Sequence, residues 1–294
     1  MEMSVACSDP LAVIHNENQW KINKVSPLYN MQYSPLKLKQ YASKIRQDLV
    51  SAITSNAAIK YSVILEDLPQ LKYSEDDSNS IMVVVKMQNT TQSKVAYTAI
   101  LLSWGKSKEI SHAVNLPYML ERGEQKIGNT VKSTLQKIFD CNINQYYFGQ
   151  HHMLLFAFSF IECDSSKSTD PFVLRFKMGE DKVNCNLEIG ELRCIWNGVK
   201  NMENDLVSLV KLAYQKLQNR AYQISNVDIT VFELCEVVLP KAHVQINGVV
   251  KVKTPEMINA FFMVLNYIYE SSILSSPKKN SKSEQFACEN PKYI

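Results

Sequence analysis

The residues that could carry out chemistry are scattered along this chain. Cysteines stand at positions 7, 141, 163, 185, 194, 235 and 288, and no two of them form a Cys-x-x-Cys pair. An odd number without paired spacing argues against the disulfide framework of a small secreted domain. Because cysteine is among the residues most often buried, we expect free thiols inside the fold of a protein kept in a reducing compartment.

Two adjacent histidines, His151 and His152, come nearest to a metal site. The apolar run Tyr147 to Glu162 predicts a long central strand, on which adjacent side chains point to opposite faces. Two histidines placed in this way cannot share one ion, and no third ligand follows at the spacing of a zinc site. The sequence therefore predicts no metal and no cofactor.

Motifs for phosphate binding and for acyl transfer are absent. The segment 123–128 has too few glycines for a P-loop, and no Gly-x-Ser-x-Gly elbow occurs. The acidic pairs Asp76-Asp77 and Glu180-Asp181 fall in predicted loops, where solvated turn residues are the usual explanation. The sequence selects no reaction, and we predict no catalytic residue.

The composition is that of an ordinary globular protein. Hydrophobic residues make up 46% and charged residues 21% of 294, enough for one large domain or two small ones. No apolar run approaches the ~20 residues of a membrane-spanning helix. The net charge is +3, and both ends are basic while the middle is slightly acidic. This asymmetry permits, without requiring, an anionic partner.

Periodicity predicts an α+β fold. Behind Ser34-Pro35, apolar residues at spacings of three and four predict an amphipathic helix, and Asn247-Gly248 predicts a hairpin. Further helices are expected at 128–139, 191–199, 203–218 and after Pro255, and strands at 60–65, 81–87, 95–104, 172–177, 182–189 and 227–239. Antiparallel runs of strands separated by single helices indicate a largely antiparallel, curved sheet with helices packed on one side.

The chain is expected to have four parts. They are a flexible N-terminus (1–18), an N-terminal α+β part (19–140), a C-terminal α+β part with a dimerisation sheet (141–270) and a disordered tail (271–294).

Two segments resemble the centromere protein L family. Residues 20–33 read WKINKVSPLYNMQY and lead into the helix SPLKLKQYASKI, and residues 129–141 read NTVKSTLQKIFDC. The first is similar to the family's opening of a Trp, a Pro-Leu-Tyr segment and an aromatic-Ser step, and the second to its helix ending in Phe-Asp-Cys. The order of elements over 19–270 is also similar.

The resemblance implies a non-enzymatic subunit of the constitutive centromere network in the nucleus. The family pairs with centromere protein N through its C-terminal sheet and joins the inner kinetochore on nucleosomes that contain the centromeric histone H3 variant, touching the adjoining DNA. Centromere protein C and the centromere protein H–I–K–M group are the further partners implied. The alternative is an α+β enzyme or small-ligand-binding domain of another family, because one fold class hosts both kinds of function.

The strand expected at 227–239 is the predicted partner edge. It is apolar apart from Glu233 and Glu236, and Pro240 follows it instead of interrupting it, so it lacks the features that usually blunt an exposed edge. The competing interpretation is a central strand that is paired on both sides. The predicted interface residues are Val231, Leu234, Val237, Leu239, Val244 and Ile246.

The predicted DNA contacts are basic residues near the two ends of the chain. These are Lys21, Lys24, Lys39, Arg46, Lys251 and Lys253. We expect them to contribute weakly and mainly within a complex, through phosphate contacts that salt weakens. For Lys39 and Arg46 the alternative is a pair of cationic side chains that flank the buried face of a helix.

Overall fold

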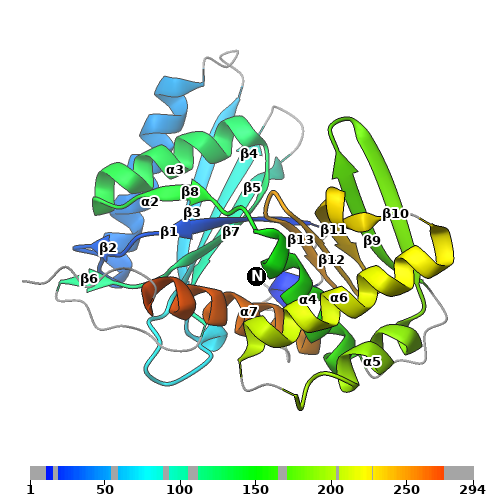
Figure 1. Ribbon diagram of the computed structural model, residues 1–294. Coiled ribbons are helices and arrows are strands. Elements are labelled where there is room, and N and C mark those ends of the chain that lie inside the picture. Colours follow the sequence, from blue (N-terminus) through cyan, green and yellow to red (C-terminus); the bar gives the residue numbers. More distant parts are fainter. Residues whose placement is uncertain are drawn as a thin grey trace, which may run out of the picture.

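The computed structural model describes residues 11–15, 19–53, 59–88, 93–104, 112–164, 171–202, 205–226 and 228–274. Most of the predicted flexible N-terminus and of the predicted disordered tail, together with Cys7 and Cys288, therefore lie outside the described residues. An open, eleven-stranded antiparallel sheet runs through the molecule with helices packed against it (Figure 1). The predicted α+β class and the largely antiparallel curved sheet are confirmed.

The sheet has the strand order β10-β9-β11-β12-β13-β1-β7-β5-β4-β3, and β8 pairs with β1. Its strands are β1 (Trp20–Val25), β3 (Lys60–Leu68), β4 (Ser80–Gln88), β5 (Ser93–Leu102), β7 (Tyr118–Gly123), β8 (Ile143–Gln145), β9 (Phe172–Met178), β10 (Asp181–Leu187), β11 (Glu233–Val238), β12 (Ala242–Gln245) and β13 (Val249–Val252). β2 (Leu28–Tyr29) and β6 (Ala113–Val114) form a separate pair.

The helices are α1 (Ala12–His15), α2 (Pro35–Ala52), α3 (Gln125–Phe139), α4 (Gln150–Cys163), α5 (Ile189–Asn197), α6 (Leu206–Ser225) and α7 (Pro255–Leu274). Short 3-10 turns occupy Pro69–Leu71 and Ile229–Val231. No helix in the described part of the chain has the length and apolar character to cross a membrane.

The helices cover opposite faces of the sheet. On β5, Ala99 and Leu101 belong to the apolar cluster under α2 and α3, whereas Ile100 and Leu102 belong to the cluster that includes α4 and α7. Since successive side chains of a strand point to opposite faces, the two clusters lie on the two sides of the sheet. Helices therefore pack on both sides of the sheet, and not on one side as predicted. The continuous apolar run in β5 is typical of a strand covered on both faces.

Local signals begin and end several elements as expected. The Ser34 side chain accepts a hydrogen bond from the Lys37 backbone N–H at 3.4 Å, and Pro35 occupies the first turn of α2. Between β12 and β13, Gly248 has a φ of +79°, and a Cβ there would lie 2.4 Å from the carbonyl oxygen of Tyr146. The turn therefore requires a glycine.

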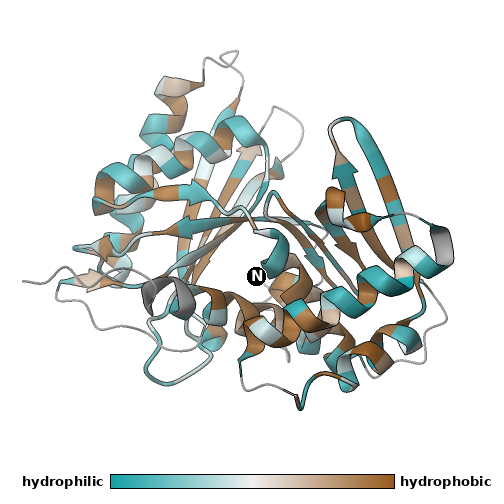
Figure 2. Cartoon of the chain, viewed as in Figure 1, coloured by the Kyte–Doolittle hydropathy of each residue, from teal (hydrophilic) through white to brown (hydrophobic). Residues whose placement is uncertain are grey.

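The prediction of a central strand over residues 147–162 is wrong, because residues 150–163 form α4. This helix is buried on nearly all sides: every residue from Met153 to Phe158 is buried, and its hydrophobic residues appear largely brown in Figure 2. A helix buried all round loses the 3.6-residue pattern that distinguishes it from a strand. Its length was the better guide, because strands usually have 3–10 residues.

The long strand expected at 227–239 is shorter in the structure. The carboxylate of Asp228 accepts a hydrogen bond from the Thr230 backbone N–H at 2.9 Å and caps the 3-10 turn Ile229–Val231. Such a local side-chain bond competes with strand pairing. β11 therefore starts only at Glu233.

The sheet continues from the N-terminal into the C-terminal part of the chain. β1 pairs with β7 on one side and with β13 on the other, with Lys21 opposite Glu121 and Val249. The predicted division at residue 140 stays a prediction about domain organisation.

Candidate partner edges and basic residues

The predicted partner strand is not an edge. β11 pairs with β9 along one side and with β12 along the other, so the competing interpretation of a central strand is the correct one. Of the predicted interface residues, Leu234, Val237 and Val244 are fully buried in the core. Leu239 is also buried, Ile246 is half-buried and Val231 is exposed in the 3-10 turn. Core packing explains the apolar character of the four buried residues.

β10 is the strand at this end of the sheet (Figure 1). Charge is confined to Asp181 and Lys182 beside the turn, and the following segment 183–187 contains no charged residue and no proline. Val183 and Cys185 are half-buried on one face, whereas Asn184 and Asn186 are exposed on the other. Within the described part of the chain, β10 therefore has an open edge, and its segment 183–187 lacks the features that blunt such an edge.

Ion pairs hold this edge to the rest of the sheet. Arg175 on β9 pairs with Glu236 on β11, and its Nε donates to Oδ1 of Asn184 on β10 at 3.0 Å. Lys177 and Glu233 add a second β9–β11 pair at 3.1 Å. These polar contacts cross β9, β10 and β11, so they hold the edge strand β10 in place against the sheet.

The hairpin geometry sets which backbone groups of β10 face outward. Gly179, with a φ of +59°, and Glu180 form a two-residue turn between Met178 and Asp181. The pair that flanks such a turn is of the hydrogen-bonded kind, and the kinds alternate along the ladder. The backbone N–H groups of Lys182, Asn184 and Asn186 consequently point away from β9.

The six predicted DNA contacts are not brought together. Lys21 and Lys251 lie on one face of the sheet, and Lys24 lies on the other, 5.7 Å from the ring centroid of Tyr269 in α7. The Nζ of Lys253 donates to the carbonyl of Pro240 at 2.5 Å. Lys39 and Arg46 project from α2, beside the opposite end of the sheet. Whether any of them binds DNA stays a prediction.

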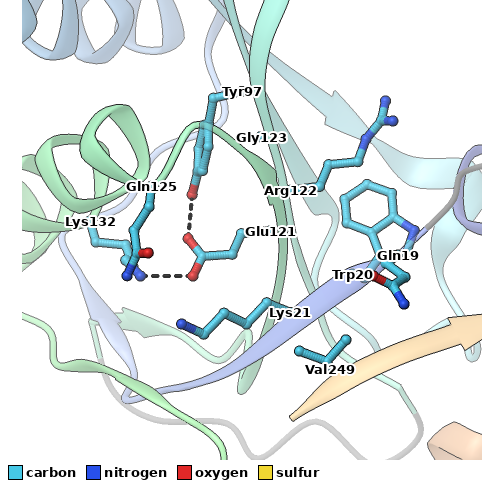
Figure 3. Close-up of a pocket in the computed structure, with 10 residues that line it drawn as sticks. All are labelled: Gln19, Trp20, Lys21, Tyr97, Glu121, Arg122, Gly123, Gln125, Lys132 and Val249. Atoms are coloured by element: carbon cyan, nitrogen blue, oxygen red, sulfur yellow. Dashed lines mark hydrogen bonds and ion pairs between the residues drawn. The ribbon is translucent and has the colours of Figure 1, made fainter. Parts of the chain in front are cut away.

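A polar hollow of about 230 Å³ surrounds Glu121, a residue that the sequence did not single out (Figure 3). Glu121 is 6% exposed, and its carboxylate accepts hydrogen bonds from the Tyr97 hydroxyl at 2.8 Å and from Lys132 Nζ at 2.7 Å. Burial, followed by the Glu121 charge, raises the pKa of Tyr97 well above its ordinary value, so the phenol is a neutral donor. At Gly128, a Cβ would lie 2.6 Å from Cε2 of Tyr97, so only glycine leaves the ring its space.

This hollow favours a structural role. The carboxylate is already neutralised by Lys132. Two further basic residues line the hollow: Lys21, the cross-strand partner of Glu121, and Arg122, whose guanidinium lies 5.2 Å over the ring of Trp20. Neither a nucleophile nor a second free acid stands at hydrogen-bond distance of Glu121 among its described contacts. Paired charges of this kind hold α3 against β7 and β5.

The histidine pair lies on a helix, so the argument from opposite strand faces does not apply. His152 is in the first turn of α4, and its Nδ1 accepts a hydrogen bond from the Gly149 backbone N–H at 3.2 Å. Within the described part of the chain, no group of three or more His, Cys, Asp or Glu residues could hold a metal ion. His152 acts as a cap for the helix start.

The capping role of His152 gives a pH-dependent prediction. Burial, with a smaller contribution from His151, lowers the pKa of His152 to about 4. Between about pH 6.5 and pH 4 the unfolded chain takes up a proton there that the folded chain does not, so stability falls as the pH falls through this window. We expect an NMR titration to show the depressed pKa, and His152→Gln, which can still accept the Gly149 bond, to reduce the loss of Tm between pH 7 and pH 5. An unshifted imidazole pKa would contradict this.

Comparison with known proteins gives two matches. A family model described as Centromere protein L matches residues 16–289, which include the whole described sheet and every described helix except α1. Centromere protein L of Gallus gallus is 20% identical over 275 residues, covering 87% of this chain and 79% of that protein.

Proposed function

The chain belongs to the centromere protein L family, and from this membership we propose that it is a non-enzymatic structural subunit of the centromere and kinetochore that serves chromosome segregation in the nucleus. The match along residues 16–289 carries the proposal. The hollow around Glu121 is consistent with it, since the carboxylate there is already paired with Lys132.

The partner proposed for this subunit is centromere protein N. The free edge of β10 supports pairing by strand addition, in which backbone hydrogen bonds supply affinity and alternate side chains supply specificity. The strand at the edge replaces β11 in this proposal. Four of the residues predicted for the interface then have an indirect role. They are buried in the core and hold the strands next to β10 in place: Leu234, Val237, Leu239 and Val244.

The heterodimer is proposed to join the larger inner kinetochore. Its further partners are centromere protein C, the centromere protein H–I–K–M group and the centromeric nucleosome with its DNA. Lys21 and Lys251 share one face of the sheet, which suits them to a joint contact with phosphates through the complex. Since Lys24, Lys39, Arg46 and Lys253 lie elsewhere, DNA contact by this chain alone is expected to be weak.

Asn186→Pro tests the partner edge. Its backbone N–H points to the open side of β10, so proline there removes one incoming hydrogen bond and places a ring in the path of the added strand, without breaking the bonds to β9. We expect the affinity for centromere protein N, measured by calorimetry, to fall at least about tenfold, or ~1.4 kcal/mol. The Tm should change little.

The matched control is Asn186→Thr, which keeps the N–H and suits a strand. Val237→Pro provides the comparison within the sheet: it removes a ladder bond from the central β11 and is expected to unfold the chain. Full binding by a folded Asn186→Pro variant would remove β10 as the partner edge, while family membership would stand.

A further inference from the structure

The sheet has a second free end, at β3. This strand pairs with β4 over its whole length, from Lys60 opposite Gln88 to Leu68 opposite Ser80. No strand in the described part of the chain pairs with its other side. With nine residues at ~3.3 Å each, β3 presents an edge of about 30 Å. The residues 61–65 carry no charge and no proline, so the middle of this edge is not blunted.

A groove runs along this edge, between β3 and α2. One hollow of about 520 Å³ and a second of about 310 Å³ share Lys39, Ala42 and Val63 in their walls and so form one continuous groove. Consecutive residues of β3, from Tyr61 to Asp67, line it. Successive side chains point to opposite faces, so a wall made of consecutive residues is the strand's backbone edge, not one of its faces.

The far wall of the groove is a basic stripe of α2. Lys39, Ser43 and Arg46 are exposed and recur at helical spacing, and Val50, 63% exposed, extends the stripe by one turn. Lys39 and Arg46 form no ion pair with any described residue, unlike Lys44 on another flank of α2, which pairs with Asp48 at 3.4 Å. The groove thus combines an open backbone edge, apolar floor residues and two cations that form no ion pair with a described residue.

We propose that this groove binds an extended acidic segment of a partner protein, which adds to the sheet beside β3. Apolar side chains of the segment would lie over Ala42 and Val63, and carboxylates at alternate positions would meet Lys39 and Arg46. Alternate strand residues are ~7 Å apart and the two cations are separated by ~10 Å along the helix, a difference that their long side chains span. The site lies at the end of the sheet opposite β10 and does not depend on the pairing proposed there.

Peptide rather than DNA is favoured by the shape and chemistry of the site. The edge of β3 offers backbone N–H and C=O groups in strand register, which a DNA backbone cannot match. Glu66 and Asp67 line the groove at its Pro35 end and repel any anionic group there, so the carboxylates of the segment would lie toward Lys39 and Arg46. The predicted DNA-binding role of Lys39 and Arg46 is therefore the competing outcome of the experiment.

The experiment uses the full chain and defined probes. A fluorescent, end-capped peptide of about nine residues that alternates valine with glutamate is compared by anisotropy with one that alternates valine with lysine, and with a short DNA duplex. We expect the glutamate peptide to bind at least about tenfold more tightly than the lysine peptide. Hydrogen exchange should show added protection in residues 61–67 and not in β10.

Two pairs of variants separate groove contacts from general charge. The double variant Lys39→Glu with Arg46→Glu should lower the affinity for the glutamate peptide about tenfold. This is the effect expected when two exposed ion pairs become repulsive. Lys37→Glu with Lys44→Glu makes the same change of charge on the same helix, away from the groove, and should leave binding nearly unchanged. Ser62→Pro and Val63→Pro are compared because only one of two adjacent N–H groups faces the open side. The proline variant at the position whose N–H faces the open side should fold and should no longer bind the glutamate peptide.

Several results would overturn the proposal. These are no binding of the glutamate peptide, equal binding of both peptides, or protection confined to another strand. Loss of duplex binding alone in the Lys39 and Arg46 variant would assign the stripe to DNA. Concentration-dependent dimers that this variant abolishes would assign the groove to a second copy, and peptide binding that appears only after removal of residues 275–294 would assign it to the chain's own tail.

Discussion

Replacing Phe261 with alanine is expected to destabilise the fold by about 3–5 kcal/mol. The Phe261 side chain is 2% exposed and lies where α7 packs on α4. Its ring stacks on Phe156 with centroids 4.8 Å apart and meets Phe148 at 6.4 Å. Truncation removes these contacts and leaves a cavity between two helices that cannot close together without moving the sheet beneath them. Denaturant unfolding, followed by circular dichroism, measures the loss.

Met263→Ala is the matched control on the same helix. Its side chain is 59% exposed, so the same kind of truncation there should change the free energy of unfolding by less than about 0.5 kcal/mol. Similar costs at the two positions would mean that α7 is not anchored by the aromatic cluster. The contrast also tests the placement of α4, whose residues the sequence pattern had assigned to a strand.

The elements that sequence predicted correctly are those with local signals. Ser34-Pro35 begins α2 because its side chain and ring act on the next turn, and Asn247-Gly248 makes a hairpin because only the turn itself decides the geometry. α4 was missed because burial on nearly all sides erases periodicity. The composition of residues 150–163 alone does not distinguish a buried helix from a buried strand.

The position of a strand within a sheet is set by residues far away along the chain. β11 is central because β9, some sixty residues earlier, pairs with it and because Arg175 meets Glu236 across that ladder. Glu233 and Glu236 look like the charges of an exposed strand in the sequence, yet each pairs with a cation on β9. The strand predicted as an edge is therefore internal, and the terminal strand at this end of the described sheet is β10. Which strand meets a partner stays a prediction.

The same limit applies to the basic residues. Helical spacing places Lys39 and Arg46 on one flank of α2, and both line the groove beside β3. What faces this pair is the free side of β3, and this follows only from the order of the sheet. The Glu121 network has no sequence signal at all, because Tyr97, Glu121 and Lys132 come from three separate elements.

Lys132→Met is expected to cost about 2–4 kcal/mol, because it leaves the Glu121 carboxylate buried with one neutral donor, Tyr97. The lower end of this range allows for Lys132 itself, whose side chain is 17% exposed. Glu121→Gln should cost less, since the amide still accepts from Tyr97 and the freed ammonium group can turn toward water. The free energies come from denaturant unfolding at neutral pH.

The double variant decides whether the pair or the packing matters. If the cost of Lys132→Met comes from an unpaired buried charge, adding Glu121→Gln removes that charge and should recover more than half of the lost stability. Additive costs would instead show that the methylene stem of Lys132 supplies the stability by packing on α3. Recovery would establish that the hollow in Figure 3 is a closed structural network, with its carboxylate committed to Lys132 and Tyr97 and not held ready for a ligand.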